Sequence, residues 1–163
     1  MQVGSIMTRK VVTLSPDDTI AEAAMKMSSA KISGAPVVDS SGRLIGILSE
    51  ADILRSLRTS QRSFHLVYPS LSAISVTFRE QVTEREAIEA YKEIEKVKVK
   101  DIMTKEVEVA HAEDELRTAI KKMISRGINR LPVVDDQGKV IGIVTRGDIL
   151  RGIAAESNNN MKL

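Results

Sequence analysis

Apolar residues recur at helical spacing twice along the chain, once in each half. The two stripes are Ile20, Ala23, Ala24 and Met27, and Leu116, Ala119, Ile120 and Met123. Apolar side chains at positions i, i+3, i+4 and i+7 lie on one face of an α-helix. The pattern therefore predicts one amphipathic helix in each half, with its apolar face toward a core.

The residues beside the two stripes predict where these helices begin and end. Ser15-Pro16-Asp17-Asp18 offers an N-cap candidate, a proline for the first turn and early acidic residues, and Glu113-Asp114-Glu115 offers acidic residues in the second copy. Such residues favour a helix N-terminus because they suit its free N–H groups. Gly127 is a natural stop, since glycine adopts the left-handed backbone that ends many helices.

Short β-rich runs surround each predicted helix. One run precedes the helix and two follow it, and a second helix then begins at Ser49 or Thr145. The runs are Val11–Leu14, Pro36–Asp39 and Leu44–Leu48 in the first copy, and Val107–Ala110, Pro132–Asp135 and Val140–Val144 in the second. Each copy is therefore predicted to be a β-α-β-β-α unit, which makes the fold class α/β (α+β).

The two copies are an internal repeat. An offset of 96 residues aligns 3–55 with 99–151 without a gap and gives identities at 23 of the 53 positions. One unit has too few helices to cover its sheet, so we expect two units packed through their sheets with pseudo-twofold symmetry. Two equivalent clefts between the repeats would be natural ligand sites. The expected organisation is repeat 1 at 1–58, a connection at 59–97 with a helix at about 84–97, repeat 2 at 98–155 and a polar tail at 156–163.

Composition and charge disfavour several function classes. The chain has 163 residues, no cysteine and a net charge of +2 that is spread along its length. Its four aromatic residues, Phe64, Tyr68, Phe78 and Tyr91, all lie in the connection. Binding of nucleic acid is therefore disfavoured, because neither a concentrated basic surface nor stacking residues in the repeats are present. No apolar run approaches the roughly 20 residues of a membrane helix, and a soluble, cytoplasmic protein is expected.

Catalytic and metal chemistry find little support in the sequence. His65 and His111 are the only histidines, and neither has an evident nucleophile or acidic cluster beside it. The glycine-rich loop that ends in Gly-Lys-Ser/Thr in P-loop proteins is absent. We therefore expect no enzyme and no metal site. Arg55, Arg58 and Arg62, at helical spacing, are expected to form a solvated helix face.

The most informative short match is Gly46–Asp52 against Gly142–Asp148. In both, a Ser or Thr precedes an Asp by three residues after a β-rich run. One interpretation is structural, since this is nearly a capping box, whose cap contributes about 1 kcal/mol. The other is functional, because a helix N-terminus binds anions, the hydroxyl donates to a phosphate and the carboxylate accepts from two ribose hydroxyls. The sequence leaves both open.

At these residues the chain resembles the cystathionine-β-synthase (CBS) domain family, whose paired form is a Bateman module. The resemblance rests on Asp101–Thr104, on the Pro-Val-Val-Asp run and on the Gly-x-x-Ser/Thr-x-x-Asp motif, each of which occurs twice in order, with Ser5 replacing the opening acid in the first copy. It implies a regulatory module that binds AMP, ADP, ATP or S-adenosylmethionine in clefts between the copies. Such modules are usually dimers of pairs, so the resemblance implies a homodimer and no catalysis.

The resemblance also implies which residues bind the ligand. In one cleft Asp148 would hold the ribose, Thr145 the phosphate and Ile143 the adenine. The residues that would complete this cleft are Ile32, Ser33 and the segment near Arg9. The pseudosymmetric cleft would use Asp52, Ser49 and Ile47, completed by Ile128, Asn129 and the segment near Lys105.

The two copies differ in charge near the motif. Arg146 replaces Glu50 and Arg130 replaces Gly34. Arg130 matches a position that contacts phosphates in some relatives, although the sequence does not fix its cleft. An arginine attracts a phosphate and a glutamate repels it, so we expect unequal affinities, with the Asp148 cleft taking the phosphorylated ligand.

The predicted function is sensing of an adenosine nucleotide and transmission of the binding state to a separate partner protein. Three alternatives stay open: a sensor of S-adenosylmethionine, a structural dimerisation module and a nucleic-acid-binding regulator. The connection at 59–97 is expected to pack on the pair, and a docking surface is the alternative, since aromatic residues favour interfaces.

Overall fold

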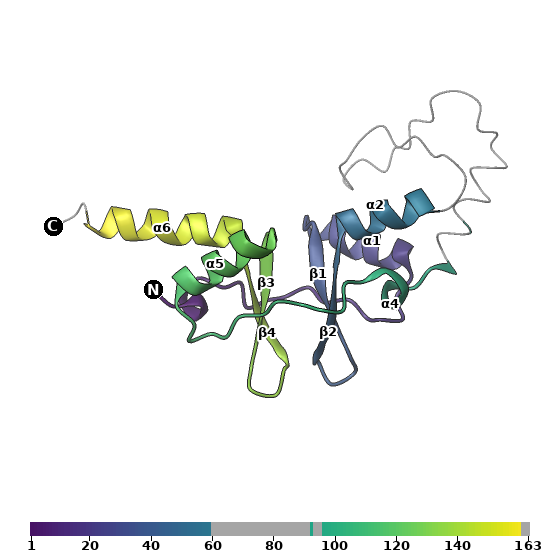
Figure 1. The fold of residues 1–163 in the computed structure, drawn as a ribbon, viewed down its shortest axis with the longest axis horizontal. Coiled ribbons are helices and arrows are strands. Elements are labelled where there is room, and N and C mark those ends of the chain that lie inside the picture. The colour runs from purple at the N-terminus through teal and green to yellow at the C-terminus, as the bar shows by residue number, and fades with distance from the viewer. Residues whose placement is uncertain (60–91, 93–95, 161–163) are drawn as a thin grey trace, which may run out of the picture. The chain divides into compact units, whose positions relative to one another are not determined.

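The computed structural model describes residues 1–59, 92 and 96–160 and has an α+β fold (Figure 1). The elements in order are η1 (Val3–Ser5), α1 (Ile20–Ser29), β1 (Gly34–Val38), β2 (Leu44–Ser49), α2 (Glu50–Thr59), α4 (Val99–Ile102), α5 (Leu116–Arg126), β3 (Arg130–Val134), β4 (Val140–Thr145) and α6 (Arg146–Asn160). The predicted connection at 59–97, with its helix and its four aromatic residues, lies almost entirely outside the described residues. Within the described ranges, no helix combines the length and apolar character that crossing a bilayer requires.

The chain forms two compact units, and each contains parts of both sequence repeats. Unit 1 comprises Met1–Val11, Ser40–Leu44 and Glu106–Leu163, and unit 2 comprises Val12–Asp39 and Ile45–Lys105. The opening segment of repeat 1 therefore belongs to the unit built on repeat 2, and the opening segment of repeat 2 belongs to the unit built on repeat 1. The repeats exchange their first residues.

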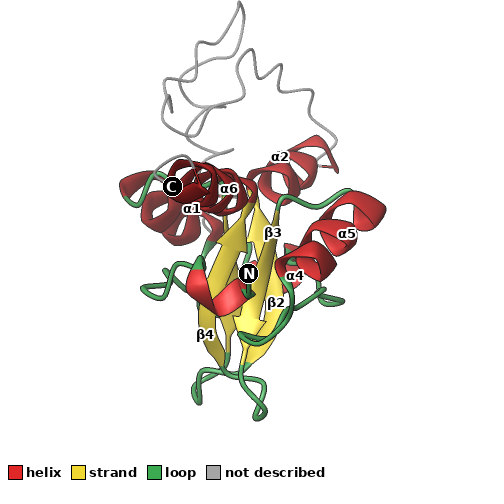
Figure 2. Cartoon of the chain, turned by 90° about the vertical axis from the view of Figure 1, so that its left-hand side faces the viewer, coloured by secondary structure: helices red, strands yellow, loops and turns green. Residues whose placement is uncertain are grey.

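Unit 1 is built on the antiparallel hairpin of β3 and β4, drawn as arrows in Figure 2. The hairpin pairs Arg130 with Thr145 and Pro132 with Ile143, and its register shifts between Val133 and Val134. Helix α5 packs on β3, and α6 packs on β4. The fully buried core residues of this unit include Val3, Ala110, Leu131, Val133 and Val144. Because Val3 comes from the exchanged segment, that segment is part of the core.

Unit 2 repeats this plan with β1, β2, α1 and α2. Its fully buried core includes Ala23, Met27, Val37, Leu48 and Val99, and Val99 is the exchanged counterpart of Val3. The runs predicted as the first strand of each repeat contribute only one bridge each, from Leu14 to Val37 and from Ala110 to Val133. Both bridges are parallel.

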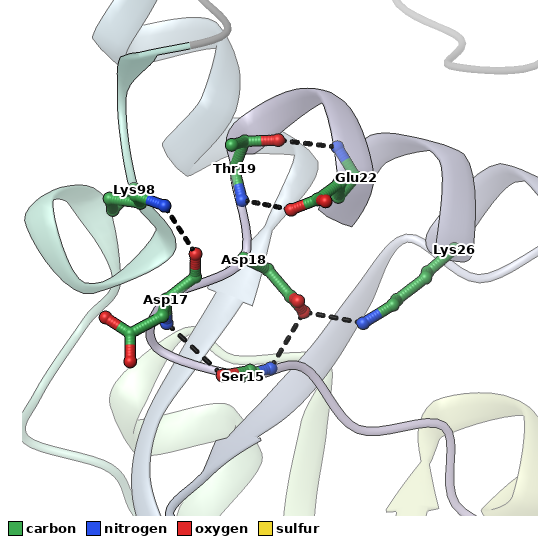
Figure 3. A network of polar contacts seen from close by, with 7 residues as sticks. All are labelled: Ser15, Asp17, Asp18, Thr19, Glu22, Lys26 and Lys98. Atoms are coloured by element: carbon green, nitrogen blue, oxygen red, sulfur yellow. Dashed lines mark hydrogen bonds and ion pairs between the residues drawn. The ribbon is translucent and has the colours of Figure 1, made fainter.

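Helix α1 begins at Ile20, after the N-cap Thr19. The Thr19 hydroxyl accepts from the Glu22 N–H at 3.2 Å, and the Glu22 carboxylate accepts from the Thr19 N–H at 2.7 Å, which completes a capping box (Figure 3). The expected N-cap at Ser15 is therefore wrong. Ser15 instead closes an upstream turn, in which its N–H donates to Asp18 Oδ2 at 2.8 Å.

The exchanged segment of unit 2 is anchored to this turn. Lys98 Nζ donates to the carbonyl of Asp17 at 2.9 Å (Figure 3), and the Val99 N–H donates to the carbonyl of Asp18 at 2.9 Å. Lys100 Nζ forms an exposed ion pair with Asp17 Oδ1 at 2.9 Å. This hydrogen bond and charge lower the pKa of the Asp17 carboxyl and raise the pKa of the Lys100 ammonium.

The ends of the later helices follow the sequence in part. Helix α5 ends at Gly127, whose φ of 64° is left-handed, as predicted. Its N-terminus differs from expectation, because Glu115 is the N-cap without a side-chain bond and Asp114 accepts from the upstream His111 N–H. Helix α6 continues to Asn160, into the stretch expected to be a tail, since no proline or glycine interrupts residues 156–160.

Candidate functional site

The candidate site of unit 1 is the N-terminus of α6. Helix α6 follows Thr145, whose hydroxyl accepts from the Asp148 N–H at 3.3 Å. Asp148 Oδ2 accepts from the Thr145 N–H at 2.8 Å and from the Thr145 hydroxyl at 2.7 Å. The structural interpretation of the motif is therefore confirmed: Thr145 and Asp148 form a capping box.

The Asp148 carboxylate is buried, with 4% of the residue exposed. Besides Thr145, it contacts two side chains through Oδ1: Arg151 Nη2 at 2.5 Å and the Thr8 hydroxyl at 3.4 Å. The Arg151 side chain is 74% exposed, so the buried carboxylate pairs with a side chain that water reaches. A buried carboxylate with hydrogen-bond partners on both oxygens stays oriented, which suits a group that must bind a ligand in one geometry.

The exchanged opening segment brings Thr8 to this site. The Thr8 N–H donates to the Ile143 carbonyl and the Ile143 N–H donates to the Thr8 carbonyl, both at 2.9 Å. Ile143 itself is only partly buried. Its side chain can therefore offer an apolar surface to a flat ring. Arg9, the next residue, is exposed and donates to the Gly4 carbonyl at 3.2 Å.

Strand β3 brings further predicted residues to unit 1. Arg130 lies directly opposite Thr145 in the hairpin register. The carbonyl of Asn129, just before it, accepts from the Arg146 N–H at 3.2 Å, while Ile128 packs against the core. Two arginines thus lie near the N-terminus of α6: Arg146 is the first residue of the helix, and Arg130 is paired with Thr145 in the hairpin.

Unit 2 carries the same arrangement at the N-terminus of α2. Asp52, 7% exposed, accepts through Oδ2 from the Ser49 N–H and the Ser49 hydroxyl, both at 2.9 Å. Its Oδ1 contacts Arg55 Nη2. Ile47, which is partly buried, and Thr104 exchange two backbone hydrogen bonds of 2.9 Å, and Lys105 follows as an exposed residue. The Ser33 carbonyl accepts from the backbone N–H that begins α2.

The structure thus divides the predicted site residues between the two units. Unit 1 contains Arg9, Ile128, Asn129, Arg130, Ile143, Thr145, Arg146 and Asp148, and unit 2 contains Ile32, Ser33, Ile47, Ser49, Asp52 and Lys105. The assignment of Ile32 and Ser33 to the Asp148 cleft stays a prediction, as does that of Ile128 and Asn129 to the Asp52 cleft.

Sequence reasoning did not name as site residues three whose side chains contact the two carboxylates, Thr8, Arg55 and Arg151, or Thr104, which pairs with Ile47 through the backbone. Arg55 is exposed, as its place on a solvated helix face predicts, and it also pairs with Asp52. A signal was present, because Arg55 and Arg151 are identical at the repeat offset and each follows its aspartate by three residues. Side chains at this spacing are neighbours on a helix surface.

The CBS domain family matches the chain twice, over residues 3–59 and 99–155. An uncharacterised protein of Methanocaldococcus jannaschii is 38% identical over 154 residues, which cover 94% of this chain and 91% of that protein. The chain spans between 22% and 62% of the length of four further curated relatives.

Two solved CBS-pair structures share the fold and hold adenosine ligands. CBSX2 of Arabidopsis thaliana in complex with AMP is 25% identical, with a TM-score of 0.70 and coverage of 96% of this chain and 98% of that chain. The CBS domain pair of protein MJ0100, in complex with 5′-methylthioadenosine and S-adenosyl-L-methionine, is 26% identical, with a TM-score of 0.69 and the same coverage. This chain belongs to the CBS domain family and carries two copies of the domain in tandem.

Proposed function

We propose that this CBS pair is a regulatory module that binds an adenosine nucleotide (AMP, ADP or ATP) and passes the binding state to a separate partner protein. The observation that carries the proposal is a buried, fixed carboxylate at a helix N-terminus beside a partly exposed isoleucine, present once in each unit. Related CBS pairs with AMP, 5′-methylthioadenosine or S-adenosyl-L-methionine in their solved structures support an adenosine-containing ligand.

In unit 1 the proposed roles follow from the chemistry of each group. Asp148 accepts hydrogen bonds from the two ribose hydroxyls, because a carboxylate has acceptor capacity on both oxygens. Thr145 and the N-terminus of α6, whose helix dipole favours an anion, bind the phosphate. Ile143 packs against the adenine. Arg130 and Arg146 add charge-assisted hydrogen bonds to the phosphate.

In unit 2 the same roles fall to Asp52, Ser49 and Ile47. Here Glu50 stands at the position of Arg146, and Gly34 at the position of Arg130. A glutamate beside the phosphate position opposes a phosphorylated ligand. The proposal therefore assigns higher affinity for AMP to the Asp148 site and lower affinity to the Asp52 site.

The regulatory part of the proposal is a population shift. A ligand that binds one conformation of the module more tightly than another increases the population of that conformation, which the partner then recognises. The module acts as a homodimer in this proposal, and it has no catalytic role. Sedimentation of the purified chain measures the oligomeric state directly.

A ligand screen by thermal shift tests the proposed function. A ligand selective for the folded state raises stability by RT ln(1 + [L]/Kd). AMP, ADP, ATP, S-adenosylmethionine, 5′-methylthioadenosine and a random oligonucleotide are compared on the intact chain and on the Asp148→Asn variant. Stabilisation by an adenosine nucleotide that Asp148→Asn reduces supports the proposal.

The other outcomes of the screen separate the alternatives. Selective stabilisation by S-adenosylmethionine would mean that the module senses this compound instead of a nucleotide. Salt-dependent binding of the oligonucleotide favours a nucleic-acid-binding regulator. No stabilisation by any compound, with a dimer in sedimentation, favours a structural dimerisation module and overturns the sensor proposal.

A further inference from the structure

The acceptor sites of the Asp148 carboxylate are already occupied in the structure. A carboxylate has about four acceptor sites, two on each oxygen. Oδ2 receives the Thr145 N–H and hydroxyl, and Oδ1 receives Arg151 at 2.5 Å and Thr8 at 3.4 Å. A ribose diol that binds this carboxylate must therefore displace one of these donors.

Among the donors closer than 3 Å to the Asp148 carboxylate, Arg151 can leave most easily. The two Thr145 bonds cap α6, so their loss would weaken the helix N-terminus. Arg151 lies at the surface with 74% of its side chain exposed, and water replaces the carboxylate as its partner when it leaves. Water reaches the arginine but not the carboxylate, so this pair is weaker than one between two buried groups, and its loss costs less than the loss of the helix cap.

The same contact recurs in unit 2, where Arg55 binds Oδ1 of Asp52 and the side chain of Arg55 is 69% exposed. Two sites thus place an exposed arginine, three residues along the helix, on Oδ1 of a buried aspartate whose Oδ2 caps the helix. A contact made once in each unit points to a property of the site rather than to one surface rotamer.

We propose that Arg151 and Arg55 compete with the ribose diol for the aspartate and thereby set the affinity of each site. This inference rests on the proposed function, because it takes the diol to be what Asp148 and Asp52 bind. Ligand binding then releases an exposed guanidinium on α6 or α2. Neutral nucleosides bear the full cost of the displacement, since they bring no phosphate to attract the released cation.

The test measures the affinity of adenosine, by calorimetry, for the intact chain and for Arg151→Gln in an Asp52→Asn background. Removing the competitor is expected to tighten adenosine binding about two- to fivefold, the range that an exposed ion pair supplies. Salt screens the Arg151–Asp148 pair, so adenosine should bind the parent protein more tightly as ionic strength rises, and this dependence should vanish in Arg151→Gln.

Two controls make the result specific. Arg126→Gln removes the same charge from an arginine that is 66% exposed and pairs with Glu108, and it should leave adenosine affinity unchanged. The second control is 2′,3′-dideoxyadenosine, which has no diol and so has no need to displace Arg151. It should bind the parent and Arg151→Gln equally, and an equal gain for both nucleosides would overturn the inference.

The remaining outcomes distinguish the inference from the proposed function. One outcome is that AMP binds, that Asp148→Asn reduces its affinity, and that Arg151→Gln does not increase the affinity for adenosine. This outcome refutes the competition and leaves the proposed nucleotide sensor intact. If neither protein binds AMP, adenosine or the other adenosine ligands, the proposed function fails and the inference fails with it. The melting temperature of ligand-free Arg151→Gln shows whether the variant is folded.

Discussion

Thr8 and Ile143 exchange both of their backbone hydrogen bonds, each 2.9 Å long, although 135 positions of the chain (143 − 8) separate them. The contact aligns the opening segment of repeat 1 with β4 of repeat 2 and places the Thr8 hydroxyl beside Asp148. Thr104 and Ile47 make the equivalent contact in unit 2. The exchange of opening segments therefore contributes a side chain to the candidate site as well as a residue to the core.

The fit of this segment depends on Gly142. A Cβ at Gly142 would lie 2.5 Å from Met7 Sδ, so Gly142→Ala must shift the buried Met7 side chain. Overpacking of this kind costs about 1–3 kcal/mol. In urea unfolding we expect Gly142→Ala to destabilise by this amount, and we expect Gly142→Ala with Met7→Ala to cost less than the sum of the single changes, because the two residues are in contact.

Gly46 is the matched control for that experiment. A Cβ at Gly46 would contact Met103 and would also lie 3.1 Å from the backbone carbonyl of Thr104. Truncating Met103 leaves the backbone clash, so Met103→Ala should relieve Gly46→Ala less than Met7→Ala relieves Gly142→Ala. Additive effects in both pairs would show that the two methionines do not fix the exchanged segments.

The four longer helices, the two hairpins and the two aspartates could be predicted from local sequence, whereas the predicted first strand of each repeat is a single bridge and the short helices η1 and α4 were not predicted. The apolar stripes are the buried faces of α1 and α5, and the Ser/Thr-x-x-Asp motif lies at the start of α2 and α6. These features depend on residues within one helical turn of each other, so their pattern is visible in the sequence. The strands β1 and β3 begin two residues earlier than the predicted Pro36 and Pro132.

The exchange of opening segments is not visible in local sequence, and only the family resemblance places the segments near Arg9 and Lys105 with Asp148 and Asp52. Ile6-Met7-Thr8 and Ile102-Met103-Thr104 are identical, so either segment offers the same side chains to either hairpin. Only packing between residues far apart in sequence decides between the two arrangements. The N-cap of α1 could not be predicted for a similar reason. Ser15 and Thr19 are both suitable N-cap residues, and Thr19 is the cap because Ser15 is held in an upstream turn by Asp18.

Lys31 and Gly127 occupy matching positions after α1 and α5, and both have a left-handed backbone, with φ of 54° and 64°. Glycine adopts this conformation without the clash that Cβ causes, which costs roughly 1–2 kcal/mol. We expect Lys31→Gly to stabilise the protein by about 0.5–1 kcal/mol after the entropy of the unfolded glycine is included. Gly127→Lys should destabilise by a similar amount. If urea unfolding shows that both variants change the free energy of unfolding in the same direction, this reasoning is contradicted.

The Asp17–Lys100 pair predicts a titration. Because Lys100 lowers the pKa of Asp17 in the folded state, the pair contributes stability above the unfolded pKa of an aspartate and loses it as pH falls through the folded pKa. Carbonyl chemical shifts of Asp17 should titrate below the ordinary value of about 3.9. Lys100→Met should raise the midpoint, and Lys98→Met should raise it less, since the charge of Lys98 has a smaller effect. Equal midpoints in all three proteins would contradict the ion pair.

The charge difference between the two sites predicts unequal affinity for a phosphorylated ligand. Arg146 is exposed at the first position of α6, and Glu50 occupies that position of α2. An exposed charge pair supplies roughly 0.2–1 kcal/mol, so Arg146→Gln in an Asp52→Asn background should weaken AMP binding about two- to fivefold. The affinity for adenosine should not change, because adenosine has no phosphate that could contact Arg146. Calorimetry with both ligands makes this comparison.

The reciprocal change tests whether the charge itself sets the difference. The variant is Glu50→Arg in an Asp148→Asn background, which leaves the unit 2 site intact. It replaces a carboxylate that repels the phosphate with a guanidinium that attracts it. The affinity for AMP should therefore rise, and the affinity for adenosine should stay the same. High salt should reduce the gain, because screening weakens exposed charges. A parallel change in adenosine affinity would instead mean that position 50 alters the shape of the site, since adenosine brings no charge for that residue to attract or repel.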